Sequence, residues 1–323
     1  MAAPRPEAPP PRVGIVGAGR TRQGLGPFLA KWFEAAGAEV VGVCGRDAAR
    51  AEVAAADLGR QLGRGVAAFA DAHALAARVD LLVVACPVEG HLAGLEAAAA
   101  AGVACLCEKP LVGWRDAARG LAAVDAFRRR GLLLAENCQW PFTLPALDAL
   151  HPEVRARPVR SLVMRLSPAW PGPTMVEDSL SHALSLLQAL APLPLDAELG
   201  DVSQTDDSAC AQENVVRFAV QTAELEVDVE LQLRCCPSQP RPAWFAVDGV
   251  RLDRRIGPDY QVSFERADGR VANVQDPLAA LVYGLVADLQ RAPRERTDAI
   301  ADAIALRLRL YAGVLERLRG PAG

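Results

Sequence analysis

Two glycines near the N-terminus are spaced to bind a phosphate group. Gly17 and Gly19 directly follow the first apolar run, and a helical pattern begins a few residues later. Glycines at a strand-to-helix turn let backbone N–H groups approach a pyrophosphate at the helix N-terminus. The segment reads G-x-G-x-x-x-x-G, so the third glycine is displaced, and an ordinary turn is the alternative. We expect Arg20, Thr21 and Arg22 to lie beside the phosphates, unless the arginines are simply solvated.

The end of the second apolar run predicts which dinucleotide binds. NAD-binding proteins usually carry Asp or Glu there for the ribose hydroxyls, whereas this chain has Gly45 followed by Arg46. Loss of the carboxylate removes repulsion against a 2′-phosphate, and a guanidinium binds phosphate through two hydrogen bonds. We therefore predict NADP(H) as the cofactor, with NAD(H) less favoured. In the alternative, Asp47 binds the ribose and Arg46 stacks on adenine, although Asp at that place is typical of a helix cap.

Apolar runs alternate with helical patterns through the first 137 residues. Each crossover between parallel strands needs a covering helix, so the alternation predicts an α/β domain with a doubly wound parallel sheet. After residue 137 the pattern changes to that of an α+β domain with an antiparallel sheet. We expect a disordered tail over 1–11, a first domain over 12–137 and a second over 138–323.

The expected elements follow from these patterns. The predicted strands are 13–16, 40–44, 66–69, 81–85, 103–107, 132–135, 159–166, 214–221, 224–234, 243–252 and 260–266. The predicted helices are 28–36, 48–58, 91–101, 114–130, 141–151, 179–190, 277–290 and 298–318.

The composition argues against several classes of protein. A chain of 323 residues with 51% hydrophobic and 23% charged residues is not disordered throughout. A net charge of −4 without a basic stripe argues against a nucleic-acid partner. The apolar runs are too short to span a membrane, and no secretory signal is present, so we expect a cytoplasmic protein. The eight cysteines show no C-x-x-C pair and no metal-ligand spacing with His, which predicts free thiols and no metal site.

Several motifs follow one another along the chain. They are Pro87 with His91, then Glu108-Lys109-Pro110, then Glu136-Asn137, and finally Asp178-x-x-x-His182. In order and spacing they resemble the Gfo/Idh/MocA oxidoreductase family over nearly the whole chain; E-K-P is the most specific motif and the glycine loop is the clearest departure. The resemblance implies a Rossmann domain, then a substrate and oligomerisation domain with a large, open, mostly antiparallel sheet. It also implies a homodimer or homotetramer.

Three residues take catalytic roles from this resemblance. By position, Lys109 matches the catalytic lysine, Asp178 the aspartate and His182 the histidine. The chemistry agrees, because residues four apart share one face of a helix. His182 suits proton transfer, and Lys109, one of only two lysines, can stabilise a developing alkoxide. Asp178 could orient His182 or bind a substrate hydroxyl; the alternatives are a helix cap for Asp178 and packing for His182.

Two further groups complete the predicted site. Lys109 is also expected near the cofactor, together with Pro87, His91 and Glu108. Packing at a helix start is the alternative for His91, and structural bonds to loop backbone are the alternative for Glu108. The candidate substrate contacts are Asn137, Trp140 and Trp170, whose indoles could stack on a sugar ring or pack in the core.

These observations predict an NADP(H)-dependent oxidoreductase. It would transfer a hydride between nicotinamide and a carbinol or carbonyl carbon of a small polyol, sugar or related metabolite. One alternative stays within the resemblance: imine reduction, or redox-assisted elimination or glycoside cleavage. Another is a non-catalytic protein that senses the cofactor. Retention of Lys109, Asp178 and His182 argues against that second alternative, whereas the altered glycine loop favours it.

Overall fold

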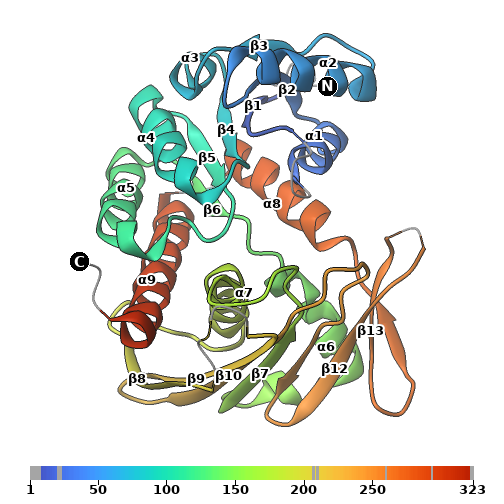
Figure 1. Cartoon of the computed structure of the whole chain (residues 1–323), viewed down its shortest axis with the longest axis vertical. Helices are drawn as coiled ribbons and strands as arrows, with labels where there is room; N and C mark the ends of the chain where they lie inside the picture. The colour runs from blue at the N-terminus through green and yellow to red at the C-terminus, as the bar shows by residue number, and fades with distance from the viewer. Residues whose placement is uncertain are drawn as a thin grey trace, which may run out of the picture. The chain divides into compact units, whose positions relative to one another are not determined.

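A computed structural model describes residues 9–19, 24–205, 208, 211–258, 260–291 and 294–320 (Figure 1). The tail predicted over 1–11 lies mostly outside these residues, and Arg20, Thr21 and Arg22 lie outside them entirely. The chain forms two compact units, each assembled from three segments. The first contains 1–108, 126–135 and 282–298, and the second contains 109–125, 136–281 and 299–323.

The first unit is built on a six-stranded sheet with the order β3-β2-β1-β4-β5-β6. The sequence explains this arrangement, because every residue of β4 and β5 is both apolar and buried. The pairs β1–β2, β1–β4, β2–β3 and β4–β5 are parallel. The strands are β1 (Arg12–Val16), β2 (Glu39–Cys44), β3 (Ala67–Phe69), β4 (Leu81–Val84), β5 (Ala104–Cys107) and β6 (Leu134–Glu136).

Helices connect these strands, as the prediction of a doubly wound sheet requires. They are α1 (Gly26–Ala35), α2 (Ala48–Leu62), α3 (Ala72–Ala76), the 3₁₀ turn η2 (Val88–Gly90), α4 (His91–Ala101), the 3₁₀ turn η3 (Trp114–Asp116) and α5 (Ala117–Arg130). Sequence patterns located all of them except the short α3 and the 3₁₀ turn η2.

The second unit is built on an eight-stranded sheet with the order β14-β13-β12-β11-β7-β10-β9-β8. Only β7 and β10 pair in parallel among its recorded pairings, so the sheet is mostly antiparallel, as predicted. The strands are β7 (Ser161–Leu166), β8 (Glu198–Gln204), β9 (Glu213–Gln221), β10 (Glu226–Arg234), β11 (Trp244–Val247), β12 (Val250–Ile256), β13 (Val262–Glu265) and β14 (Val271–Asn273).

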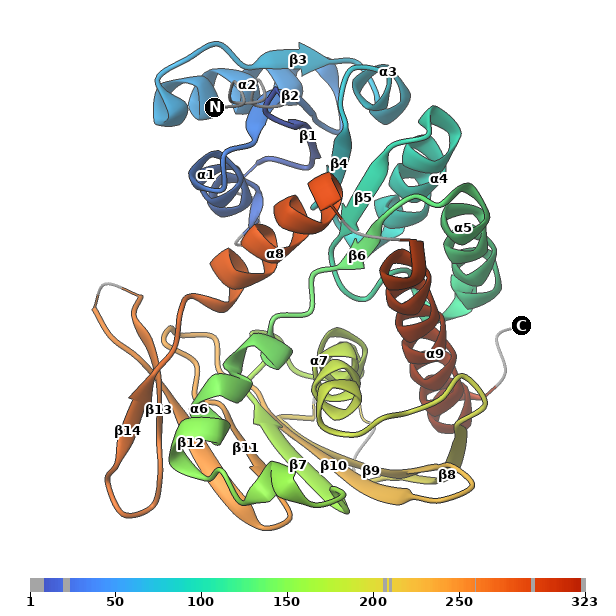
Figure 2. The ribbon, with the colours of Figure 1, turned by 180° about the vertical axis from the view of Figure 1, so that it is seen from behind.

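One face of this sheet is covered by helices (Figure 2). Helix α7 lies over β7, β9 and β10. Along β10, buried residues alternate with more exposed ones, which is the pattern that predicted a sheet with one covered face.

The remaining elements are η4 (Trp140–Thr143), α6 (Leu144–Leu150), η5 (Val154–Ala156), α7 (Thr174–Leu190), α8 (Pro277–Arg291) and α9 (Arg294–Arg319).

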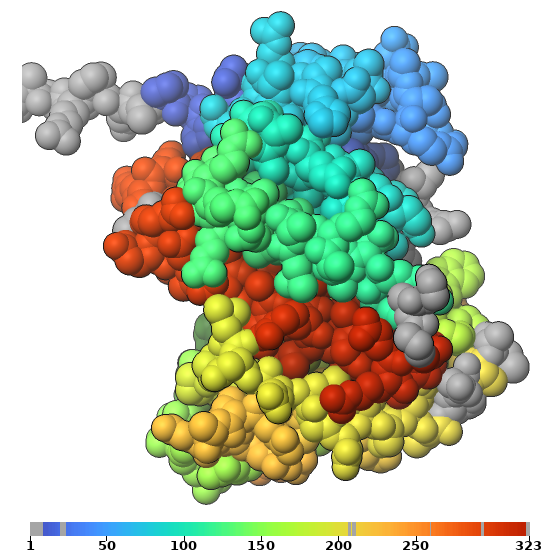
Figure 3. Space-filling view, turned by 90° about the vertical axis from the view of Figure 1, so that its left-hand side faces the viewer, coloured from blue at the N-terminus to red at the C-terminus, as the bar shows by residue number. Residues whose placement is uncertain are grey.

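The end of α9 fastens the edge of the second sheet. The Arg317 guanidinium donates hydrogen bonds to the backbone oxygens of Leu199, at 3.0 Å, and Gly200. Both acceptors belong to β8, an edge strand that the sequence patterns did not identify. Figure 3 shows the red end of α9 and the yellow strand side by side at the surface.

One predicted strand was wrong. The run 243–252 is a hairpin rather than a single strand: β11 ends at Val247 and β12 begins at Val250. The turn consists of Asp248 and Gly249, whose φ angles are 48° and 81°. Asp-Gly is a strong signal for a two-residue hairpin turn, because both residues must adopt positive φ. Two apolar runs that flank a tight turn look like one continuous strand when the turn is overlooked.

Two predictions about composition can be compared with the described residues. The seven described cysteines are free, four of them buried, while Cys210 lies outside the described residues. No helix in the described part of the chain is long and apolar enough to cross a bilayer.

Candidate active site

The first glycine of the loop after β1 occupies a position that only glycine fits. Gly17 has a φ of +87°, and a Cβ atom there would lie 2.6 Å from the backbone of Cys86. Its N–H donates a hydrogen bond to the Cys44 oxygen at 2.9 Å. The turn therefore runs tightly between β2 and β4, which is the backbone path that the first glycine of dinucleotide loops allows. Gly19 follows it at an exposed bend.

The glycine that lets helix α1 approach the sheet is Gly26. A Cβ atom on Gly26 would lie 2.6 Å from the Cα of Ala18, so the helix N-terminus packs directly on the glycine turn. This close contact is the task of the third glycine in dinucleotide loops. The predicted spacing ended at Gly24 and so missed Gly26, which begins α1 and is followed directly by Pro27. The longer spacing between the glycines therefore still lets the N-terminus of α1 contact the glycine turn.

The end of β2 leaves no room for a carboxylate side chain at residue 45. A Cβ atom on Gly45 would lie 2.7 Å from the Ala51 nitrogen, so an acid does not fit at this position. Asp47 caps α2, because its carboxylate accepts a hydrogen bond from the Arg50 N–H at 2.9 Å. Arg46 is exposed and has no hydrogen bond or ion pair with the residues described. The capping alternative for Asp47 is therefore the one observed.

The remaining residues expected near the cofactor line loops at the ends of β4 and β5. Pro87 is exposed and precedes η2, while His91 is 1% exposed and starts α4. The His91 Nε2 lies 2.9 Å from the Cys86 oxygen, so the ring fixes the loop after β4. Glu108 donates its backbone N–H to the Val84 oxygen at 2.8 Å. His91 thus packs at the start of α4, and its place near a cofactor stays a prediction.

In the second unit, Lys109 and helix α7 are joined directly. The Lys109 ammonium donates a hydrogen bond of 2.8 Å to the backbone oxygen of Asp178. The Lys109 side chain keeps partial exposure, so its remaining N–H groups can bind another oxygen. Lysine thus presents a positive charge beside the second turn of α7.

His182 follows Asp178 by one helical turn and is neutral at pH 7. Burial, and then the positive charges of Lys109 and Arg254, hold the pKa of His182 well below 6.5. The residue as a whole keeps partial exposure, but its Nδ1 atom is buried and has no hydrogen-bond partner among the described residues. A neutral imidazole can accept a proton, so His182 is in the form that a general base needs.

Asp178 is not a helix cap. Helix α7 begins at Thr174, five residues before the predicted start, and Pro173 occupies the cap position. Asp178 is exposed inside the helix, and the structure records no hydrogen bond between its carboxylate and His182. Binding of a substrate hydroxyl therefore stays the open prediction for this side chain.

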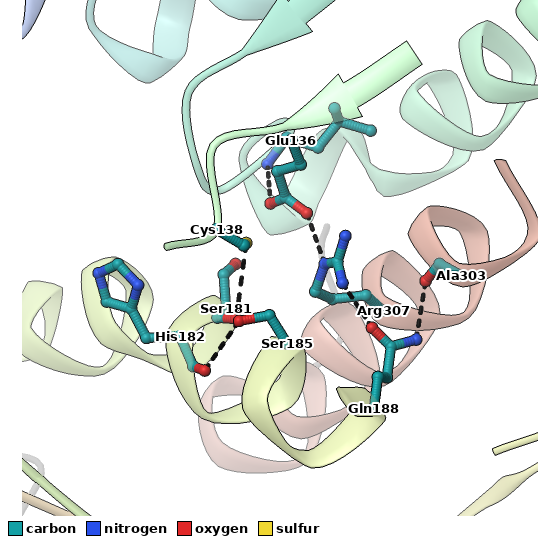
Figure 4. A network of polar contacts seen from close by, with 9 residues as sticks. Glu136, Cys138, Ser181, His182, Ser185, Gln188, Ala303 and Arg307 are labelled. Atoms are coloured by element: carbon teal, nitrogen blue, oxygen red, sulfur yellow. Dashed lines mark hydrogen bonds and ion pairs between the residues drawn. The ribbon is translucent and has the colours of Figure 1, made fainter. Parts of the chain in front are cut away.

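A buried polar network contacts the segment that follows Lys109 (Figure 4). Glu136 accepts hydrogen bonds from the Leu111 N–H at 3.0 Å and from the Arg307 Nε at 2.6 Å. Arg307 also donates to the Gln188 side chain at 2.5 Å, and Gln188 donates to the Ala303 oxygen at 2.8 Å. Burial would lower the pKa of Arg307, but attraction to Glu136 raises it. Leu111 follows Lys109 by two residues, so the network anchors the segment that carries the lysine.

The predicted substrate contacts differ in how much surface they offer. Trp170 is 69% exposed in the loop before α7 and can cover a flat ligand. Trp140 is 5% exposed, and its ring packs edge-on against Phe245 and Phe264, at 6.2 and 6.3 Å between centroids. Asn137 is 1% exposed and accepts a hydrogen bond from Gln139 at 3.2 Å. The packing alternative is thus what the structure shows for Trp140.

Arg254 joins this group, and sequence reasoning missed it. It lies on β12, the second strand of the hairpin that was predicted as one strand. Its guanidinium lies 5.4 Å from the centre of the Trp140 ring, and its charge acts on His182. A charged residue between Asp253 and Arg255 gives no sequence signal of burial, so only the fold reveals its place.

Comparison with known proteins identifies relatives that match a part or most of the chain. A family described as "Oxidoreductase family, NAD-binding Rossmann fold" matches residues 11–137. The D-apiose dehydrogenase of Paraburkholderia graminis is 27% identical over 277 residues, which are 77% of this chain and 69% of that protein. The UDP-N-acetylglucosamine 3-dehydrogenase of Acidithiobacillus ferrooxidans is 31% identical over 202 residues, or 61% of this chain and 60% of that protein.

Solved structures share the fold along nearly the full length. The structure of UDP-N-acetylglucosamine 3-dehydrogenase GnnA from Acidithiobacillus ferrooxidans has a TM-score of 0.69 at 23% identity and covers 96% of this chain and 99% of its own. GenD2 from gentamicin A biosynthesis, solved in complex with NAD, has a TM-score of 0.68 at 19% identity, with 98% of each chain covered. At these identities the likeness shows the fold alone.

Proposed function

The chain belongs to the Gfo/Idh/MocA family of oxidoreductases, and we propose that it is an NADP(H)-dependent dehydrogenase of a sugar or polyol. The observation that carries this proposal is the hydrogen bond from Lys109 to the Asp178 backbone oxygen, one helical turn before His182 on α7. It brings a cation that can bind an oxygen to the helix that carries a neutral imidazole able to accept a proton. The sugar dehydrogenases among the relatives support the substrate class.

The first unit has the features that a dinucleotide needs. Gly17 and Gly19 would hold the pyrophosphate, and Gly26 keeps the N-terminus of α1 close to it. Arg46 would bind a ribose 2′-phosphate, since Gly45 excludes an acid and Asp47 is already bonded to the backbone of α2. A nicotinamide dinucleotide held by these residues would supply the hydride acceptor for oxidation and the hydride donor for reduction.

The residues of the second unit would manage the oxygen of the reacting group. Lys109 would donate a hydrogen bond to that oxygen and stabilise its negative charge as it develops. His182 would take the hydroxyl proton during oxidation, which its neutral form allows. Asp178 would bind a neighbouring hydroxyl, and Trp170 would cover the ring. Lys109 and His182 are partly exposed, and Asp178 and Trp170 are exposed.

A cofactor titration tests the proposal. We expect NADPH to bind at least tenfold more tightly than NADH, measured by quenching of protein fluorescence. Arg46→Ser should remove that preference, because the 2′-phosphate loses its guanidinium, whereas Arg60→Ser at the far end of α2 should keep it. Failure to bind either dinucleotide would contradict the dehydrogenase itself, while equal affinities would contradict the choice of NADP(H) alone.

A further inference from the structure

Arg254 is a charged residue on the covered face of the second sheet. Along β12, Leu252 and Arg254 share one face, whereas Arg251 and Arg255 are exposed on the other. Arg254 pairs across strands with Phe264, which is fully buried. A guanidinium on this face has to be explained, because apolar residues normally fill such positions.

The hydrogen bonds of Arg254 leave part of its guanidinium unused. One terminal nitrogen donates to the Arg241 oxygen at 2.9 Å, and the plane lies 5.4 Å from the Trp140 ring centre. The Nε atom is buried and has no hydrogen-bond partner among the described residues. Packing against Trp140 explains where the side chain lies, but it does not satisfy the Nε–H donor.

Among the described residues, no acidic side chain forms an ion pair with Arg254, and the charge that acts on it is positive. Burial and the charge of Arg241 lower the pKa of Arg254 to about 10. Lys109 and Arg254 both act on His182 with the same sign. The neighbouring Asp253 is bonded to Arg251, and Arg254 forms no ion pair within the part of the chain that the structure describes. A cation whose buried donor has no partner among the described residues is complementary to an anion.

We propose that Arg254 binds an oxyanion carried by the substrate, either a carboxylate or a phosphate on the sugar or polyol. This inference rests on the proposed function, since it assigns the substrate class of the same site. The free Nε–H donates to the oxyanion, and Trp140 holds the guanidinium in place from the other side. A neutral sugar leaves this donor unpaired, so the site discriminates against it.

Binding to the cofactor-free protein tests this assignment separately from hydride transfer. Calorimetric titration would use sets of sugars that differ only in the oxyanion, such as D-glucose, D-glucuronate and D-glucose 6-phosphate. We expect at least one anionic member to bind ten or more times tighter than its neutral counterpart, and the preferred member identifies the oxyanion as carboxylate or phosphate. Arg254→Met should abolish the preference, and Arg254→Lys should retain part of it.

The matched control is Arg255→Gln, which removes one positive charge from the opposite face of the same strand. It should keep the preference, which excludes an effect of net charge. The melting temperature of Arg254→Met should equal or exceed that of the wild type, because a buried donor without a partner is removed. The assignment would be overturned if the anionic and neutral sugars bound with equal affinity in every set, or if no sugar bound. It would also be overturned if Arg254→Met lowered the melting temperature by several degrees. NADPH binding, measured in parallel, decides the proposed function independently.

Discussion

The buried Glu136–Arg307 pair should tolerate the loss of both charges better than the loss of one. The side chains are 3% and 11% exposed, and their ion pair is 2.6 Å long. In Arg307→Met, the carboxylate stays buried without its counterion. In Glu136→Gln/Arg307→Met neither charge remains, and the glutamine oxygen can still accept the Leu111 N–H. The comparison therefore isolates the cost of an unpaired buried charge.

The expected magnitude follows from the bonds that disappear. Arg307→Met removes the Arg307 hydrogen bonds to Glu136 and Gln188, and hydrogen bonds to charged groups contribute about 1.5–3 kcal/mol each. Breaking a buried ion pair by removing one partner costs about 3–5 kcal/mol, which is the same range. We expect the free energy of unfolding to fall by about 3–5 kcal/mol in Arg307→Met. The double variant should recover about 2 kcal/mol of this loss.

Urea unfolding at pH 7, followed by tryptophan fluorescence and circular dichroism, measures these changes. The control is Arg217→Met, which breaks an exposed pair with Glu230 and should cost less than about 1 kcal/mol. The reasoning would be refuted if the double variant were no more stable than Arg307→Met, or if Arg307→Met and Arg217→Met cost the same. Either result would mean that burial of the pair does not determine its energy.

Three further predictions concern the proposed site. Lys109→Met should lower kcat by a factor of about 10²–10³ because alkoxide stabilisation is lost. Lys31→Met, which changes the other, exposed lysine, should leave kcat unchanged. Equal kcat values for the two variants in steady-state kinetics would contradict the role of Lys109 in stabilising the alkoxide. As pH falls below about 6.5, His182 takes up a proton in the unfolded wild type but not in the folded one, because its pKa is lowered by folding. The free energy of unfolding of the wild type therefore falls by up to about 1.4 kcal/mol per pH unit. His182→Gln should remove this loss. Parallel curves for wild type and variant, in unfolding experiments between pH 7 and 5, would exclude this linkage. Gly17→Ala should weaken NADPH binding at least tenfold because its Cβ collides with backbone, whereas Gly37→Ala, with a φ of +82° but open space, should bind normally in the same titration.

Most of the first unit could be predicted because its signals are local. Continuous apolar runs predicted buried parallel strands, and Asp47 before a helical pattern predicted the cap that the structure shows. The second unit was harder, because strands exposed on one face give shorter and weaker patterns. The hairpin at Asp248 was missed although its Asp-Gly turn carries a known signal. Edge strand β8 has mostly exposed or half-exposed residues and gave no apolar run to detect.

The site was predictable only where spacing along the chain carries the information. Gly17 and the four-residue spacing of Asp178 and His182 could be read directly. Gly26 could not be assigned, because its role depends on a helix touching Ala18. Arg254 could not either, because its burial arises from strands and a tryptophan that lie far away in the sequence.

The charges around His182 connect proton transfer with the choice of substrate. With only cations acting on it, the imidazole stays neutral and can take a proton from a hydroxyl, but it is poorly suited to give one back. An oxyanion bound by Arg254 would offset one of those charges and raise the pKa of His182 toward its ordinary value. Substrate that carries the anion would then make both directions of the reaction accessible, since an acid–base group works best when its pKa lies near the operating pH. A neutral substrate would lack both the hydrogen bond and this adjustment, so discrimination should be larger in kcat/KM than in binding alone.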